Sequence, residues 1–130
     1  KVMPKHPNIV FKPFDYYKDE FPKGSDVILL SHVLQTESEN VCKYLLKQSY
    51  NALNNGGLLL IHGVLCKGNG FEPPSAAILS LLFFLVFEGG DTYSVGDICS
   101  WVKEAGFKGI EVIELKPPSI ATLVMARKEA

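Results

Sequence analysis

The chain has 130 residues, of which 47% are hydrophobic and 21% are charged, and its formal net charge is −1. This length suffices for one domain with a modest core, and the composition is that of an ordinary globular chain. No block of Lys or Arg alternates with aromatic residues, so we expect no nucleic-acid partner and no anionic membrane surface. The longest apolar run, over 76–87, is shorter than the roughly 20 residues that a membrane-spanning helix needs.

The three cysteines, Cys42, Cys66 and Cys99, are scattered and show no C-x-x-C spacing. An odd, scattered set provides no disulfide framework and is typical of a reducing compartment. Cys42 and the histidines also lack the spacing of metal ligands. The opening residues show no signal-peptide pattern and do not begin with Met. We therefore expect a cytoplasmic protein without a metal site, of which this chain is a part.

The first predicted elements are two strands and a helix. Residues 8–12 form a short β-rich run between prolines, which predicts a strand. Residues 26–31 are almost continuously apolar, which is typical of a strand buried on both faces of a parallel sheet. A helix then begins at one of two N-cap candidates, Thr36 or Ser38. It ends in the turn over 54–57, where glycine supplies a left-handed cap.

The rest of the chain continues the alternation of strands and helices. The remaining predicted elements are a buried strand over 58–65, a loop over 67–70, an apolar helix over 76–87, an amphipathic helix over 94–105, and strands over 110–115 and 121–126. This order predicts an α/β fold with a mostly parallel sheet. The last two strands are joined by a short connection, which predicts an antiparallel hairpin.

Five segments resemble, in order, motifs of the small-molecule O-methyltransferases of bacteria and plants. They are PKGSDV at 22–27, SHVLQT at 31–36, ALNNGGLLLI at 52–61, GGDTYS at 89–94 and AGF at 105–107. The resemblance implies a Rossmann-like class I methyltransferase sheet whose final strand is antiparallel. It also implies that residues 1–130 are the carboxyl-terminal part of the catalytic domain, without the glycine-rich cofactor loop and without the amino-terminal region through which the family forms homodimers.

In the family sheet, two further strands separate the strand at 8–12 from the strand at 26–31. Neither of those two strands is expected in this chain. The strand at 26–31 should therefore present an open hydrophobic edge.

The resemblance implies S-adenosylmethionine as the cofactor. Asp15 falls on the family's Asp that accepts from the adenine amino group, and Tyr16 falls on the next residue, which packs on the ring. Ser31 falls on a position that lines the methionine side, at a strand end where ligands of open α/β sheets lie. The alternatives are an Asp in an ordinary turn and a serine that is simply buried.

The family's catalytic base is the His of an L-H-D-W motif, and Gln35 occupies that position here. A glutamine cannot take up a proton at neutral pH. His32 directly follows the predicted strand over 26–31, and His62 is expected at the end of the neighbouring strand. An unperturbed imidazole titrates near neutrality. Each is a candidate substitute base, and the alternative for each is a structural role.

We therefore expect methyl transfer to a hydroxyl of a small aromatic or apolar molecule. One alternative is a relative that binds cofactor or ligand without O-methyl transfer. Another is a nicotinamide-dependent dehydrogenase, which the antiparallel hairpin argues against. The apolar helix over 76–87 is expected to be either a wall of the acceptor site or a plain core helix.

Overall fold

The computed structural model describes residues 6–68 and 72–130, so residues 69 and 70 of the predicted 67–70 loop lie outside the described part. Four strands form one sheet in the order β1-β2-β4-β3. Their bounds are Ser25–Ser31 for β1, Leu53–Gly63 for β2, Lys108–Glu114 for β3 and Thr122–Arg127 for β4. β1 and β2 are parallel, and β4 runs antiparallel to both β2 and β3. The predicted terminal hairpin is confirmed.

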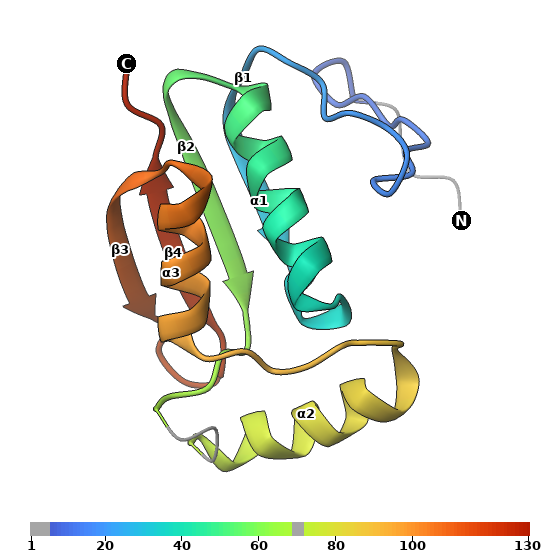
Figure 1. The fold of residues 1–130 in the computed structure, drawn as a ribbon, viewed down its shortest axis with the longest axis vertical. Helices are drawn as coiled ribbons and strands as arrows, with labels where there is room; N and C mark the ends of the chain where they lie inside the picture. Colours follow the sequence, from blue (N-terminus) through green and yellow to red (C-terminus); the bar gives the residue numbers. More distant parts are fainter. Residues whose placement is uncertain (1–5, 69–71) are drawn as a thin grey trace.

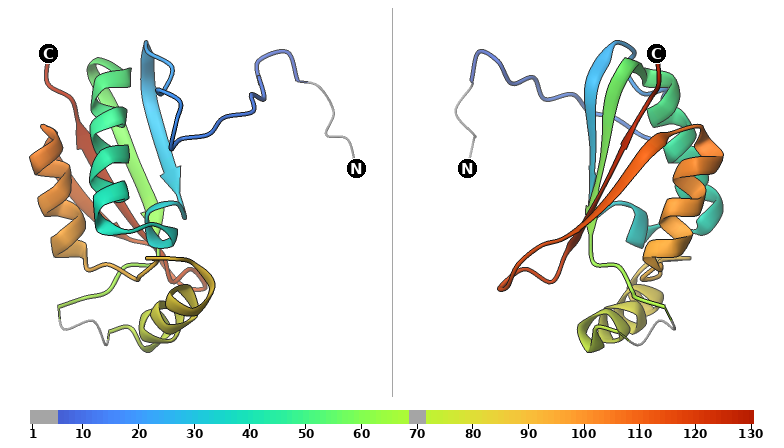
Figure 2. Two further views of the ribbon diagram at one scale, coloured as in Figure 1. Left: turned by 45° about the vertical axis from the view of Figure 1, so that its right-hand side comes forward. Right: turned by 90° about the vertical axis from the view of Figure 1, so that its left-hand side faces the viewer.

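The helices are arranged around one face and one end of this sheet. α1 (Glu39–Ala52) and α3 (Val95–Ala105) pack side by side on the same face (Figure 2). α2 (Pro74–Val86) lies across the end toward which β1 and β2 run (Figure 1). A short 3-10 helix, η1 (Leu34–Thr36), joins β1 to α1. The opposite face of the sheet carries no helix from the described residues.

The core lies between α1, α3 and the covered face of the sheet. On α1 the residues on one face are buried, among them Cys42, Leu45 and Leu46. They meet Leu59 from β2 and the inward stripe of α3, which includes Trp101. The alternation along β2, in which every second side chain is buried, follows from having helices on one face only.

α3 has a hydrogen-bonded cap at each end. The Ser94 Oγ accepts from the Asp97 N–H over 3.0 Å, which caps the first turn. Gly106 ends the helix with φ +111°, and its N–H donates to the carbonyl of Lys103 over 2.9 Å. These two caps fix the bounds of the helix where the sequence predicted them.

The predicted strand over 8–12 is wrong. Residues 6–14 form no strand, they are exposed, and the segment leads away from the sheet (Figure 2). Strand propensity produces a strand only where a neighbouring backbone can pair with it. No described strand lies beside this segment, so its apolar residues, Ile9, Val10 and Phe11, remain in contact with solvent.

β1 differs from the prediction in its burial. Within the described residues it pairs only with β2, so the expected open edge is confirmed. The expectation of burial on both faces is wrong, because Val27 and Leu29 point to the uncovered face and are 54% and 57% exposed. Only Leu30 is fully buried in this strand.

The end of α1 also differs from the prediction. The helix stops at Ala52, and its C-cap, Leu53, is extended rather than left-handed. Gly56 does have a left-handed φ of +79°, but it lies inside β2, next to the irregular pairing between β1 and β2. The glycine pair therefore shapes the start of β2 and does not cap the helix.

α2 is not a core helix. Only Ala76 is buried in it, whereas Ile78, Phe84 and Leu85 are each at least 71% exposed. Nothing in the described part of the chain covers these three side chains. None of the helices in that part is long and apolar enough to cross a membrane.

Candidate active site

The carboxyl ends of β1 and β2 bring three predicted site residues together. In the parallel register Ser31 lies opposite His62. The N–H of His32, the next residue after β1, donates to the carbonyl of His62 over 2.8 Å. Because parallel strands end at the same edge, residues far apart in sequence become neighbours there. This is the edge at which open α/β sheets hold their ligands.

The side chains at this edge form one polar cluster. The rings of His32 and His62 meet edge to face, with centroids 4.8 Å apart and an interplanar angle of 86°. The Ser31 Oγ lies 3.0 Å from His62 Nδ1. The Gln35 Nε2 lies 3.1 Å from His32 Nδ1. Ser31, His32, Gln35 and His62, which we call the His cluster, thus include every predicted catalytic residue.

The two imidazoles have different hydrogen-bonding roles. An amide nitrogen only donates, so Nδ1 of neutral His32 accepts from Gln35 and its proton is on Nε2. A hydroxyl both donates and accepts, so His62 can keep its proton on Nδ1, toward Ser31, and present a bare Nε2. His62 is therefore suited to take up a proton, and His32 is suited to donate a hydrogen bond.

The backbone at His32 is strained. Its φ is +54°, in the left-handed region, where no other non-glycine residue of the described chain lies. Such a conformation costs about 1–3 kcal/mol and is frequent at functional sites. The chain turns sharply here, and the turn brings Gln35 back to the imidazole.

The His cluster opens into a hollow of about 480 Å³. Leu79 and Phe83 from α2 line it, together with Val64 and the connection between β3 and β4. The hollow therefore combines apolar walls with a few polar groups, which is the usual make-up of a small-molecule site. For the helix over 76–87, observed as α2, the sequence predicted either a wall of the acceptor site or a core helix. The position of Leu79 and Phe83 agrees with the first alternative.

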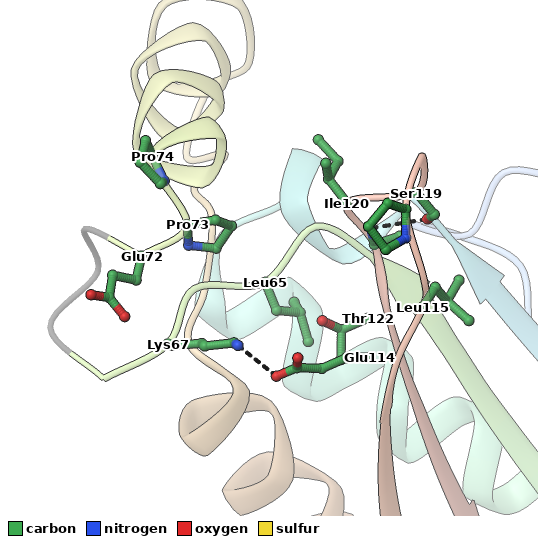
Figure 3. A pocket seen from close by; sticks show the side chains of 12 residues that line it. Leu65, Lys67, Glu72, Pro73, Pro74, Glu114, Leu115, Ser119, Ile120 and Thr122 are labelled. Atoms are coloured by element: carbon green, nitrogen blue, oxygen red, sulfur yellow. Dashed lines mark hydrogen bonds and ion pairs between the residues drawn. The ribbon is translucent and has the colours of Figure 1, made fainter.

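A second hollow, of about 490 Å³, lies beside the first and shares part of the β3–β4 connection with it. Lys67 and Glu114 line it and pair at 2.7 Å, and Figure 3 shows this pair together with Pro73 and Leu65. Both charged side chains are more than half exposed, and exposed pairs of this kind contribute little stability. No histidine lines this hollow, so we assign the chemistry to the hollow of the His cluster.

Asp15 and Tyr16, the predicted cofactor residues, lie outside the His cluster. The Asp15 carboxylate accepts from the Tyr17 N–H over 3.1 Å and pairs with Lys18 at 3.2 Å. Its carbonyl accepts from the N–H groups of Lys18 and Asp19. In this structure Asp15 is thus part of a local turn, and 44% of its side chain is exposed.

Sequence analysis did not identify Glu37 as a site residue. Its side chain is 6% exposed, and its carboxylate accepts hydrogen bonds from the hydroxyls of Tyr16 and Tyr17. Burial and then the hydrogen bond to Glu37 raise the pKa of Tyr16. The hydrogen bond to Glu37 is the main reason why the pKa of Tyr17 is also raised. Two adjacent tyrosines in a loop do not by themselves indicate a shared acceptor, so the sequence carried no signal for Glu37.

The cysteines have no part in the His cluster. Cys42 and Cys66 are buried, and burial raises the pKa of the Cys42 thiol from 9.0 to about 12 and also raises the pKa of Cys66. A protonated, buried thiol is a poor nucleophile. Among the described residues, no group of three or more His, Cys, Asp or Glu side chains is placed to hold a metal ion.

The chain is similar to known methyltransferases in sequence. A family model described as an O-methyltransferase domain matches residues 2–108. The L-tyrosine C(3)-methyltransferase of Streptomyces lavendulae is 38% identical over 102 residues, which are 76% of this chain and 27% of that protein. The 3-hydroxy-5-methyl-1-naphthoate 3-O-methyltransferase of Streptomyces sahachiroi is 28% identical over 88% of this chain and 33% of that protein.

Solved structures extend the similarity to the fold. Human N-acetylserotonin methyltransferase, in complex with S-adenosylmethionine, superposes with a TM-score of 0.85 at 25% identity, over 98% of this chain and 36% of that one. An O-methyltransferase family 2 protein from Planctomyces limnophilus, in complex with apigenin, superposes with a TM-score of 0.80 at 32% identity, over 88% of this chain and 34% of that one. The predicted Rossmann-like methyltransferase fold is confirmed, and the chain spans about a third or less of the length of these relatives. The chain belongs to the O-methyltransferase domain family.

Proposed function

We propose that this chain is the carboxyl-terminal part of an S-adenosylmethionine-dependent methyltransferase domain whose acceptor is a hydroxyl of a small aromatic molecule. The observation that carries the proposal is the His cluster at the floor of a hollow with apolar walls. The names of two relatives support the acceptor class, because tyrosine and naphthoate are both aromatic.

The residues present fit the cofactor. Adenosine offers an exocyclic amine and a flat ring, and methionine offers charged polar groups. Asp15 has an exposed carboxylate for the amine, Tyr16 has a half-buried ring for the purine, and Ser31 has an exposed hydroxyl at the strand end. S-Adenosylmethionine, when bound, supplies an electrophilic methyl group on a sulfonium ion.

The His cluster supplies the proton chemistry. With the cofactor bound, Nε2 of His62 would take up the proton of the acceptor hydroxyl as the bond from oxygen to the methyl carbon forms and the carbon–sulfur bond of the sulfonium ion breaks, which leaves S-adenosylhomocysteine. His32 donates from Nε2 to a second polar atom of the acceptor, and Gln35 fixes the orientation of His32. A positioned base contributes roughly 10²- to 10⁴-fold, and holding the reactants at near-attack distance contributes further. The proton leaves from His62 after the product departs.

Methyl transfer to a ring carbon is the second candidate function. It is favoured by the 38% identity to a protein named as a tyrosine C(3)-methyltransferase and by the glutamine at the motif position of the O-methyltransferase base. In that reaction a bond would form between a ring carbon and the methyl carbon, the carbon–sulfur bond of the sulfonium ion would break, and the ring proton would then be lost to a base.

The experiment uses the full-length protein that contains this chain. Calorimetry with S-adenosylmethionine is expected to show binding, and mass spectrometry with a panel of phenols is expected to show a product heavier by one CH₂ unit. With a ¹³C-labelled methyl group, carbon NMR of the product separates an O-methyl from an aryl-methyl group. The absence of cofactor binding and of any methylated product would contradict the proposal.

The resemblance also supports a homodimer in the full-length protein, and the scattered free cysteines support a cytoplasmic location. Light scattering after size-exclusion chromatography tests the first, with a monomer as the contrary result. Cell fractionation tests the second, with recovery in the membrane or secreted fraction as the contrary result.

A further inference from the structure

We infer that Glu37 is a positioning residue that ties the loop carrying Asp15 to the segment carrying the His cluster, so that the cofactor side and the acceptor side of the site are held in one geometry. The inference rests on the proposed function for its link to S-adenosylmethionine. The tie itself is visible in the contacts of Glu37 within this chain.

On one side, Glu37 holds the loop through two tyrosines. Both carboxylate oxygens lie within hydrogen-bond distance of the Tyr17 hydroxyl, at 2.7 and 2.6 Å, and Oε1 also accepts from the Tyr16 hydroxyl. The two tyrosine rings are 4.7 Å apart, so they approach the same carboxylate together. The Tyr17 N–H in turn donates to Asp15 Oδ1 over 3.1 Å. The orientation of the Asp15 carboxylate therefore depends on where Glu37 holds Tyr17.

On the other side, Glu37 is fixed to the site segment. Its N–H donates to the carbonyl of Leu34 over 3.2 Å, and its carbonyl accepts from the Tyr93 hydroxyl over 2.6 Å. Gln35, which holds the imidazole of His32, lies between Leu34 and Glu37. A movement of the Glu37 backbone would therefore displace the residue that orients His32.

The charge and shape of a carboxylate are what this position requires. An ionised carboxylate has two accepting oxygens and no donor, so it can serve two hydroxyl donors at once. The amide of glutamine is uncharged, and its NH₂ group would replace one of the two carboxylate oxygens that now accept from Tyr17. Hydrogen bonds to a charged group are also stronger than neutral ones, and each corresponds to roughly a tenfold or greater change in an equilibrium. Because the carboxylate is buried, water does not replace a lost bond readily.

The test compares Glu37→Gln with Glu39→Gln in the full-length protein. Glu39 lies two residues further on, is 56% exposed and pairs with Lys43, so it controls for the loss of one carboxylate in the same region. In Glu37→Gln we expect the KM for S-adenosylmethionine to rise roughly tenfold or more, with a smaller change in kcat. Backbone amides over 14–19 are expected to exchange faster with deuterium, and two tyrosines are expected to ionise at lower pH in an absorbance titration. Glu39→Gln should leave the KM, the exchange over 14–19 and the ionisation of Tyr16 and Tyr17 unchanged, since the charge of Glu39 is not among the causes that raise the pKa of either tyrosine.

Three outcomes decide the inference. If the backbone amides over 14–19 exchange as fast in Glu37→Gln as in the unaltered protein, and the tyrosines ionise at the same pH in both, the inference is overturned. If the unaltered protein binds no S-adenosylmethionine, the proposed function fails, but the exchange and titration readouts still decide whether the tie exists. If Glu37→Gln does not fold, Tyr17→Phe replaces it, because Tyr17 is 58% exposed and loses only the hydroxyl. Faster exchange over 14–19 in Tyr17→Phe would support the tie, and unchanged exchange would overturn it.

Discussion

The side chain of Gln35 packs directly against the backbone of Gly63. A Cβ at position 63 would lie 2.7 Å from Gln35 Oε1, so the amide end of the Gln35 side chain would have to move to make room for it. Gly63 has no left-handed φ, so an added side chain there would meet Gln35 and would not strain the backbone. The side chain that contacts His32 thus lies directly against the last residue of β2.

Gly63→Ala should therefore reduce methyl transfer without unfolding the protein. The new methyl group displaces Gln35 and releases His32, and a misplacement of about 1 Å near the reacting groups can lower the rate roughly 10²-fold. The measurement is kcat at saturating S-adenosylmethionine. Gly96→Ala is the matched control, since the nearest atom to a Cβ there is 3.7 Å away. Full activity in Gly63→Ala would show that the position of Gln35 does not matter.

Gly106→Ala should destabilise the fold. At φ +111° an alanine is strained, and its Cβ would lie 3.1 Å from the ring of Tyr50. Together these effects should lower the free energy of unfolding by roughly 2–4 kcal/mol. Gly109→Ala, with φ +57° and no atom within 4 Å, carries the backbone strain alone and should cost about 1–2 kcal/mol. Urea denaturation measures both, and equal losses would contradict the contact with Tyr50.

Stability should fall in alkaline solution. Burial raises the pKa of Cys42 from 9.0 to about 12, so above pH 9 the unfolded chain releases this proton while the folded chain keeps it. The folded state then binds more protons than the unfolded state, and the free energy of unfolding falls with a slope of about 1.4 kcal/mol per pH unit. Tyr16 and Tyr93, whose pKa values burial also raises, steepen the fall above their ordinary value of 10.0.

Urea denaturation in steps from neutral pH to about pH 11 measures this slope. Cys42→Ala removes the thiol, so its stability should depend less on pH between 9.0 and 10.0 than that of the unaltered protein. Identical slopes for the two proteins would show that Cys42 is not the group responsible.

The sequence predicted those parts of the fold whose signals are local. The amphipathic helix predicted over 94–105 is observed as α3 within one residue, because its caps, Ser94 and Gly106, act within their own turns. The strand over 8–12 was predicted in the same way and is absent, because a strand also needs a partner that local pattern cannot supply. Gly56 shows the same limit. The sequence predicted a left-handed glycine at the end of α1, and Gly56 has such a φ but lies inside β2.

The site was predictable to a similar extent. Ser31, His32 and His62 could be brought together from the sequence because parallel strands end at a common edge. Glu37 could not, because its partners lie 20 and 21 residues earlier in a loop without periodicity. The position also departs from the tryptophan of the motif that it resembles, so the resemblance assigned it no role.

The rate of methyl transfer by His62→Asn in the full-length protein tests the account most directly. Asparagine keeps a polar side chain beside Ser31 but cannot take up a proton. At saturating S-adenosylmethionine we predict a loss of roughly 10²- to 10⁴-fold in kcat, with full activity in His6→Asn, whose imidazole lies on the exposed amino-terminal segment. An unchanged kcat in His62→Asn would contradict the assignment of His62 as the proton acceptor.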